Sequence, residues 1–558
     1  MRPIRFLLGA LSAAILAGPA LGQEATKEDA ASIAELKRQI DALQHRVEEL
    51  ESGRKSKPTA TAARRNEVPA PAKTYKPAPA YPVTSTPTSA YPVASTSTPA
   101  YPVIAVPPPR PVPTTIPGLL PPEPMGEQFE DALRSDLPGL SIRIPGTLSE
   151  LRFYGFAKVS AWADFNGRNQ TGAPTVQTIP LVNSPADMQG GDFGMTPQFS
   201  RFGMDSRTLT ALGTLETRIE GDFGGTAAPP FPSVNHAFRL RQAWAELGTE
   251  SFRVLIGQAN SLWNEGMYET LIDSTNLNQS FIRQAQIRAT ATLAPGWIGQ
   301  ISLEAPETQY TSVDGIFTPG SSPIGGLSPA ITNLPDLLGR LNYSDSSVEF
   351  EVRGLARELS IRTAGTAVAP SGLTLNTLGW GAATHARVFM RSLSEAFGAD
   401  QLIGMAYYGQ GIGRYFAGNS FGQDALSNIG LPVTNFSLDA LPTYGATAAY
   451  RRFWIPQLRS NIAYSWAWQE YPSYALEFIP GSPSAVFLNN NMQQGIVNLI
   501  WSPFAQYHDG VVDTGWLDIG VEYIYSRRNV FGGDAATLPA SLANGTANRI
   551  LGAATGRF

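Results

Sequence analysis

The sequence predicts an all-β fold: a transmembrane antiparallel β-barrel of about 16 strands, preceded by a short N-terminal coiled-coil helix and a disordered Pro-rich linker. Three observations support this fold class. Beyond about residue 148, the hydrophobic pattern alternates with a period of two over many long runs. After the first twenty or so residues, no apolar run approaches the roughly 20 residues of a transmembrane helix. Charged residues make up only 16% of the 558-residue chain, which contains no cysteine.

Composition excludes several classes of protein. The lack of cysteine excludes a disulfide-stapled module and a cysteine-ligated metal protein. A net charge of −5 gives no basic footprint for binding nucleic acid. A hydrophobic fraction of 43% is too high for a wholly disordered chain.

Residues 1–22 have the pattern of a secretory signal peptide. Arg2 and Arg5 precede the apolar run 6–17, and the small residues Ala20 and Gly22 suit cleavage before residue 23. A retained membrane anchor is the alternative. Export would place the N-terminal segment that begins at residue 23 in the periplasm and the barrel in the outer membrane of a Gram-negative bacterium.

Residues 23–52 are predicted to form the coiled-coil helix, because apolar residues alternate at spacings of three and four. The seam residues are Ile33, Leu36, Ile40, Leu43, Val47 and Leu50. Their side chains alone favour two strands, and an amphipathic helix lying on another surface is the alternative.

Residues 53–125 form the predicted linker, which is rich in Pro, Ala, Thr and Ser. The segment Ala-Tyr-Pro-Val recurs at 80–83, 90–93 and 100–103. Such a composition favours extended polyproline II structure and a spacer role, with binding of a periplasmic partner or peptidoglycan as the alternative. A short connecting segment, 126–147, leads to the barrel at 148–558.

The barrel strands are predicted from alternation, with apolar faces toward lipid and charged faces toward a water-filled lumen. The candidate strands lie near 151–165, 199–208, 212–223, 236–247, 251–259, 281–293, 296–304, 336–345, 347–359, 376–392, 399–413, 442–454, 458–470, 491–502, 514–527 and 546–558. A terminal aromatic residue, here Phe558, is typical of such barrels, although the residues that alternate back from it form a weak apolar face.

Alternation also predicts which charged residues face the lumen. The basic candidates for contact with anions are Lys158, Arg201, Arg207, Arg218, Arg239, Arg241, Arg288, Arg353, Arg357 and Arg459. The acidic pore-lining candidates are Asp205, Glu216, Glu220, Asp222, Glu349, Glu351, Asp518 and Glu522. A guanidinium group is always charged and its fork matches carboxylate or phosphate, so this lining favours small anions. Pairing of these charges between neighbouring strands is the alternative.

The Lys to Arg ratio changes where the barrel begins. Before residue 151 the chain has six Lys and ten Arg, and from there on it has one Lys and 24 Arg. The change indicates that the cations of the barrel are suited to pore walls and membrane interfaces.

Ordered segments resemble a known family. They are "IPGTLSELRFYGFAKVSAWADF" (144–165), "SRFGMDSRT" (200–208), "LETRIEGDFGG" (215–225), "FRLRQAWAELG" (238–248), "LIGQANSLW" (255–263), "LPDLLGRLNY" (334–343), "GQGIGRYF" (409–416) and "VNLIWSPF" (497–504). Together with the predicted signal peptide, coiled coil and linker, this order resembles the DcaP-like trimeric outer-membrane porins, over roughly residues 140 to 528. The resemblance implies a homotrimer in outer-membrane lipid and passive uptake of dicarboxylates.

We therefore expect a porin for small anionic solutes. A phosphate-type anion-selective porin and an envelope tether anchored by the barrel are the alternatives. No enzyme, catalytic residue, cofactor or metal site is expected. The pattern Gly-Asn-Ser-Phe-Gly at 418–422 lacks the strand–turn–helix setting of a nucleophile elbow. The histidines His45, His236, His385 and His508 have no metal-ligand spacing.

Overall fold

The computed structural model describes residues 137, 139–167, 175–225, 236–264, 268–272, 276–318, 328–363, 365, 370–416, 423–508 and 511–558. The predicted signal peptide, coiled coil and linker lie outside the described residues. Among the residues that are described, no helix is long and apolar enough to cross a bilayer.

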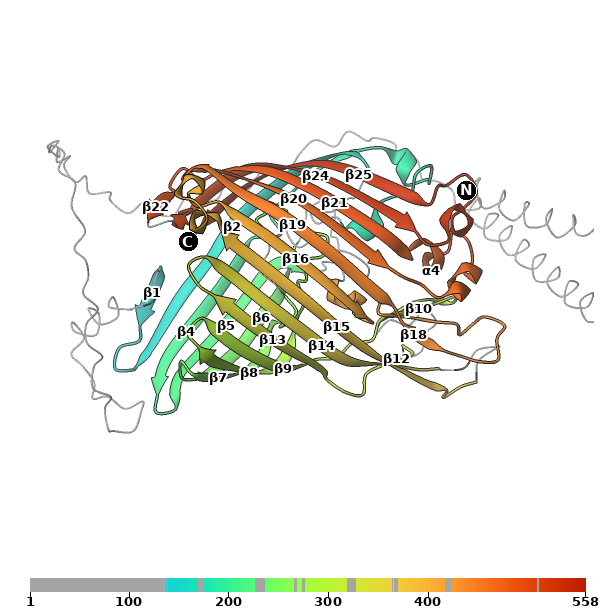
Figure 1. The fold of residues 1–558 in the computed structure, drawn as a ribbon, viewed down its shortest axis with the longest axis horizontal. Coiled ribbons are helices and arrows are strands. Elements are labelled where there is room, and N and C mark those ends of the chain that lie inside the picture. Colours follow the sequence, from blue (N-terminus) through green and yellow to red (C-terminus); the bar gives the residue numbers. More distant parts are fainter. Residues whose placement is uncertain are drawn as a thin grey trace, which may run out of the picture. The chain divides into compact units, whose positions relative to one another are not determined.

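Sixteen antiparallel strands close into a barrel (Figure 1). They are β2 (Ser149–Asn166), β4 (Arg201–Thr210), β5 (Gly213–Gly225), β6 (Ala237–Gly248), β7 (Phe252–Asn260), β8 (Arg283–Ala294), β9 (Trp297–Glu304), β13 (Asp336–Ser344), β14 (Val348–Arg362), β15 (Thr374–Phe389), β16 (Gln401–Gln410), β19 (Pro442–Ile455), β20 (Leu458–Gln469), β21 (Asn489–Trp501), β24 (Leu517–Val530) and β25 (Asn544–Arg557). Each pairs with its neighbours, and β2 pairs with β25 to close the ring. Closure leaves no edge of the barrel wall with unpaired backbone N–H and C=O groups, which could not find hydrogen-bond partners in the hydrocarbon of a membrane. The predicted antiparallel barrel of about 16 strands is confirmed.

Each predicted barrel strand corresponds to an observed one, with shifts at the ends. Residues 390–392, predicted as the end of a strand, form a 3-10 turn, and β16 ends at Gln410 rather than 413. Short strands in the connections were not predicted. They are β1 (Leu140–Arg143), β3 (Asp192–Thr196), β10 (Tyr310–Ser312), β11 (Gly315–Phe317), β12 (Ala330–Ile331), β17 (Ala425–Ser427), β18 (Leu438–Ala440), β22 (Gln506–His508) and β23 (Val511–Asp513).

The connections also contain short helical turns. These are η1 (Val176–Thr178), η2 (Asp187–Gln189), η3 (Met390–Ser392), η4 (Glu395–Phe397), η5 (Gly413–Phe416), η6 (Ser473–Glu477), α4 (Pro483–Val486) and η7 (Gly533–Ala536). Each of them spans three to five residues, so none contributes a helical layer.

The two faces of the barrel wall differ in polarity. On β5, the apolar Ile219 and Phe223 are exposed on the outer face, while Glu220 and Asp222 between them are buried on the inner face. On β24, Val521 and Tyr523 are likewise exposed and Glu522 is buried. Successive side chains of a strand point to opposite faces, so this alternation gives the barrel an apolar exterior and a polar interior.

The barrel has a short-turn end and a long-loop end. Only Ala211 and Leu212 separate β4 from β5, whereas residues 411–441 separate β16 from β19. The C-terminal Phe558 lies at the short-turn end, where its backbone pairs with Gly155 of β2. In outer-membrane barrels the short turns face the periplasm and the long loops face outward.

Candidate functional site: the lumen and its arginine cluster

The connection between β7 and β8 folds into the barrel. Its backbone N–H groups at Leu271 and Ile272 donate to the carboxylate of Glu522 on β24, at 2.8 and 3.2 Å. Farther along, the N–H of Leu277 donates to Gln494 on β21 at 2.8 Å. Since β21 and β24 lie across the ring from β7 and β8, the connection must cross the lumen. We call its described residues, 261–264, 268–272 and 276–282, the inner loop.

Four of the predicted lumen residues hold the inner loop. Lys158 donates to the carbonyl of Leu271 at 2.5 Å, and Arg353 donates to the carbonyl of Trp263. Arg459 forms a two-pronged pair with Glu269 of the loop, at 2.7 and 2.6 Å.

The fourth of these residues is Glu522, which accepts the loop N–H groups described above. Asp518 supports the arrangement by pairing with Arg459 at 3.1 Å. These side chains are almost fully buried, so they position the loop and do not face a solute.

A second group of wall residues gathers at β4, β5 and β6, with β2 beside them. We call Arg152, Arg201, Arg218, Arg239 and Arg241 the arginine cluster. Asp205 accepts from Arg152 and from Arg218, the latter at 2.7 and 3.0 Å. The Arg152 and Arg218 guanidinium groups also lie over the ring of Tyr154.

The remaining arginines of the cluster share two acids. Asp222 accepts from Arg239, at 2.6 and 3.1 Å, and from Arg241. Glu220 lies 3.4 Å from Arg201 and 3.5 Å from Arg241, and accepts from the hydroxyl of Tyr154 at 3.1 Å.

Charge in the arginine cluster is not balanced. Five guanidinium groups share the three carboxylates Asp205, Glu220 and Asp222. The side chains of Arg152, Arg201, Arg218 and Arg239 are 26–39% exposed, whereas those of the carboxylates are only 1–14% exposed. The cluster therefore presents positive charge to the lumen over a buried acidic layer.

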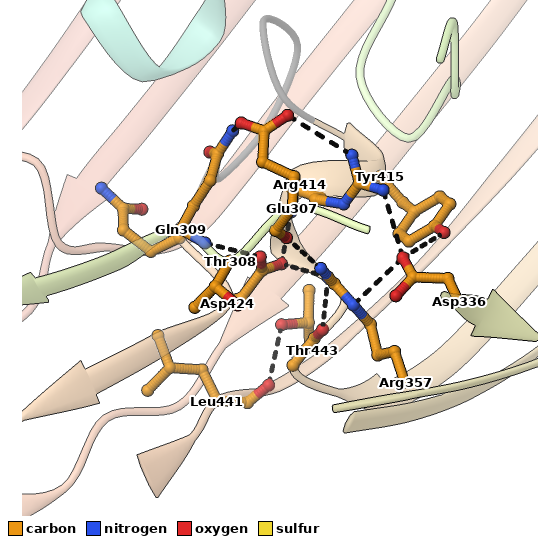
Figure 2. Close-up of polar contacts among 12 residues, drawn as sticks. Glu307, Thr308, Gln309, Asp336, Arg357, Arg414, Tyr415, Asp424, Leu441 and Thr443 are labelled. Carbon is orange, nitrogen blue, oxygen red and sulfur yellow. Dashed lines mark hydrogen bonds and ion pairs between the residues drawn. The ribbon is translucent and has the colours of Figure 1, made fainter. Parts of the chain in front are cut away.

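The other predicted residues are dispersed. Arg207 and Glu216 are cross-strand neighbours near the short-turn end, and both are exposed. Arg288 donates to Gln286 at 3.0 and 2.7 Å and to the carbonyl of Asn260. Glu349 pairs with Arg387 at 2.9 Å, and Glu351 pairs with Arg340 and lies 3.6 Å from Arg353. Arg357 is buried at the long-loop end, between Asp336 and Asp424 (Figure 2).

Sequence reasoning missed several inward cations on the wall. Arg340 of β13, Arg387 of β15 and Arg451 of β19 follow the same alternation, and that alternation could have found them. Their side chains are 17–21% exposed. Glu269 of the inner loop was also missed, because a residue of an irregular loop has no periodic signal.

The histidines form no site among the residues described. His385 is buried in the barrel wall and His508 lies exposed at the short-turn end, while His45 and the stretch 418–422 fall outside the described part of the chain. No group of three or more potential metal ligands is present within the described ranges.

Comparison with solved structures identifies the fold. The outer membrane channel DcaP of Acinetobacter baumannii matches with a TM-score of 0.55 and 19% identity, over 74% of this chain and 97% of that chain. An anion-selective porin from Comamonas acidovorans matches with a TM-score of 0.43 and 11% identity, over 74% of this chain and 100% of that chain. OmpT of Vibrio cholerae matches with a TM-score of 0.42 and 8% identity, over 74% of this chain and 99% of that chain.

Only the first of these three matches is close enough in fold to support an inference. It shows that the barrel shares the fold of an outer-membrane channel. No protein-family model and no curated protein sequence matches the chain.

Proposed function

We propose that the protein is an outer-membrane porin for small anionic solutes, with dicarboxylates as the preferred class. One observation carries the proposal: four of the five side chains of the arginine cluster are partly exposed to the lumen, while the three carboxylates of the cluster lie buried beneath them. Fixed positive charge on a pore wall lowers the barrier for anions and raises it for cations. A carboxylate fits the guanidinium fork, which supports a dicarboxylate solute.

Location and assembly belong to the same proposal. The apolar exterior and the barrel fold support insertion in the outer membrane, with the N-terminal segment in the periplasm. A homotrimer is consistent with the family that the sequence resembles. The envelope tether depends on residues outside the described part of the chain and stays a prediction.

Replacing exposed members of the arginine cluster tests the proposal. Arg201→Gln combined with Arg239→Gln removes two lumen charges without breaking the contact of Arg241 with Asp222. We expect the zero-current potential in a KCl gradient to move toward zero or into the cation-selective range. Arg241 is a poorer target, because its side chain is only 4% exposed and so presents little charge to the lumen.

A matched control is Arg391→Gln, since Arg391 is exposed in the turn between β15 and β16, outside the lumen. It removes the same charge and should leave selectivity unchanged. An unaltered potential in the double variant, or an equal shift in the control, would contradict the assignment of the cluster.

Phosphate-type selectivity is the second candidate, since the guanidinium fork fits phosphate as well as carboxylate. Block of the chloride current by succinate and by inorganic phosphate separates the two. Stronger block by succinate favours the dicarboxylate channel, and stronger block by phosphate favours the alternative.

A further inference from the structure

A small sheet lies across the long-loop end of the barrel. Its strands run in the order β11-β10-β17-β18, and β10 and β17 pair in parallel, which joins the β9–β13 connection to the β16–β19 connection. We call it the mouth sheet. Figure 1 shows β10 and β18 at the end of the barrel that carries α4.

Apolar contacts place the mouth sheet between β14 of the wall and the β20–β21 connection. Tyr310 and Ala425 of the sheet share an apolar cluster with Leu359 and Ile361 of β14. On the other side, Leu426 packs in a cluster with residues of the β20–β21 connection. The sheet therefore covers part of the mouth.

A buried ionic cluster fastens the mouth sheet to the wall (Figure 2). Arg357 of β14 contacts Asp424, which directly precedes β17, at 3.0 Å, and Asp336 of β13 at 3.3 Å. Arg414 of η5 contacts the same Asp336 at 3.1 Å. We call these four residues the latch. A buried ion cluster is weak evidence for stability, because apolar residues of similar volume often stabilise a fold equally well. Its better attested role is that of a switch between two arrangements.

Asp424 is the titratable member of the latch that lies next to the mouth sheet. Its carboxylate accepts from the backbone N–H groups of Arg414 and Gln309, at 2.8 and 3.1 Å. Complete burial raises its pKa to about 6, although Arg357 and Arg414 oppose that shift.

Two other carboxylates belong to the surroundings of the latch and to the mouth sheet. Glu307 is 3.7 Å from the Arg414 guanidinium, and Asp439 of β18 accepts from Tyr474 at 2.8 Å and from Ser437 at 2.7 Å. No histidine belongs to the set of contacts that the described residues make around the latch.

We infer that the mouth sheet is a movable gate of the proposed channel, which the latch holds against β14 more firmly in acid than at neutral pH. The inference rests on the proposed function, whose pore it regulates. The direction of this pH dependence follows from proton linkage. A carboxyl group whose pKa is about 6 when latched and about 4 when solvated binds its proton more tightly in the latched state. Protonation of this group stabilises the latched state fully below about pH 4, and the stabilisation is lost as the pH rises through about 6. Over this range the equilibrium constant between the latched and open states changes by up to roughly 100-fold.

Cysteine labelling tests the gate directly, because the natural chain has no cysteine. Ala425→Cys places a thiol on β17, where Ala425 is fully buried. Its reaction with a small charged thiol reagent is followed in the folded protein in lipid. The rate is divided by that of Ala396→Cys, an exposed position in η4, to remove the intrinsic pH dependence of the thiol. We expect this ratio to rise about tenfold or more between about pH 5 and about pH 8.

Two further substitutions in the labelled background identify the switch. Asp424→Asn imitates the protonated carboxyl group and should keep the introduced thiol on β17 protected at every pH. Asp439→Asn removes a carboxylate from the same sheet but outside the latch, and should retain the pH dependence.

A labelling ratio that stays constant with pH in the Ala425→Cys background would overturn the gate, and this result needs no Asp424 variant to fold. A wild-type pH profile in Asp424→Asn would overturn the role of Asp424. Labelling requires no ion current, so a barrel that conducts nothing would contradict the proposed function while leaving this test readable.

Discussion

At the scale of single residues, charge in the lumen has two separate tasks. Exposed arginines such as Arg201, Arg218 and Arg239 face the lumen, whereas buried groups such as Arg459 and Glu522 hold the inner loop. Alternation places both kinds on the inner face, so the pattern alone cannot distinguish them. The difference depends on what a distant loop brings to each position, which is a tertiary property.

Removing the Glu522 carboxylate should loosen the inner loop. In Glu522→Ala, the N–H groups of Leu271 and Ile272 lose their acceptor while buried. We expect a loss of about 1–3 kcal/mol in the free energy of unfolding. Single-channel recordings should show a noisier open level, because the loop crosses the lumen.

Glu395→Gln is the control for this substitution, since Glu395 lies exposed in η4 at the short-turn end. It should change neither stability nor noise. A quiet, wild-type open level in Glu522→Ala would show that Glu522 does not position the loop.

At the scale of elements, the barrel strands were predictable and the connections were not. A strand such as β24 carries its alternation over 14 consecutive residues, so its two faces can be read locally. The strands of the mouth sheet have three residues each, and β10 and β17 come from connections more than a hundred residues apart. Such short strands show no periodicity, and their pairing depends on the latch and on apolar contacts with β14.

The seam between β2 and β25 contains a buried ion pair. Arg549 of β25 donates to both oxygens of Asp164 on β2, at 2.6 and 2.8 Å, and both side chains are only 3% exposed. Removal of one partner leaves an uncompensated buried charge. We expect Arg549→Met to destabilise the barrel by about 3–5 kcal/mol, measured by thermal unfolding in detergent.

The double variant Asp164→Asn with Arg549→Met should recover much of that loss, because no buried charge then lacks a partner. Equal stability of the single and double variants would show that the pair does not couple the two strands across the seam.

At the scale of the whole molecule, the wall and its contents divide the lumen. The inner loop bonds to β2, β14, β20, β21 and β24, and the mouth sheet packs on β14. The arginine cluster on β2, β4, β5 and β6 has no such cover among the residues described, and four of its five side chains stay partly exposed. We therefore expect solutes to pass along this side of the barrel.

The distribution of cations is consistent with this division. From residue 151 onward the chain has a single lysine, Lys158, and that lysine is bonded to the inner loop. Sequence alone could identify the excess of arginine and the inward face. It could not show which arginines stay exposed, because that depends on the folded positions of the inner loop and the mouth sheet.

The most direct test of the central claim is the zero-current potential of the purified wild-type protein in a planar bilayer under a KCl gradient. The excess of exposed arginine over exposed carboxylate predicts that chloride crosses more readily than potassium, and that added succinate blocks the chloride current. A potential of the sign that marks potassium preference, or a barrel that carries no current, would contradict the proposed anion channel.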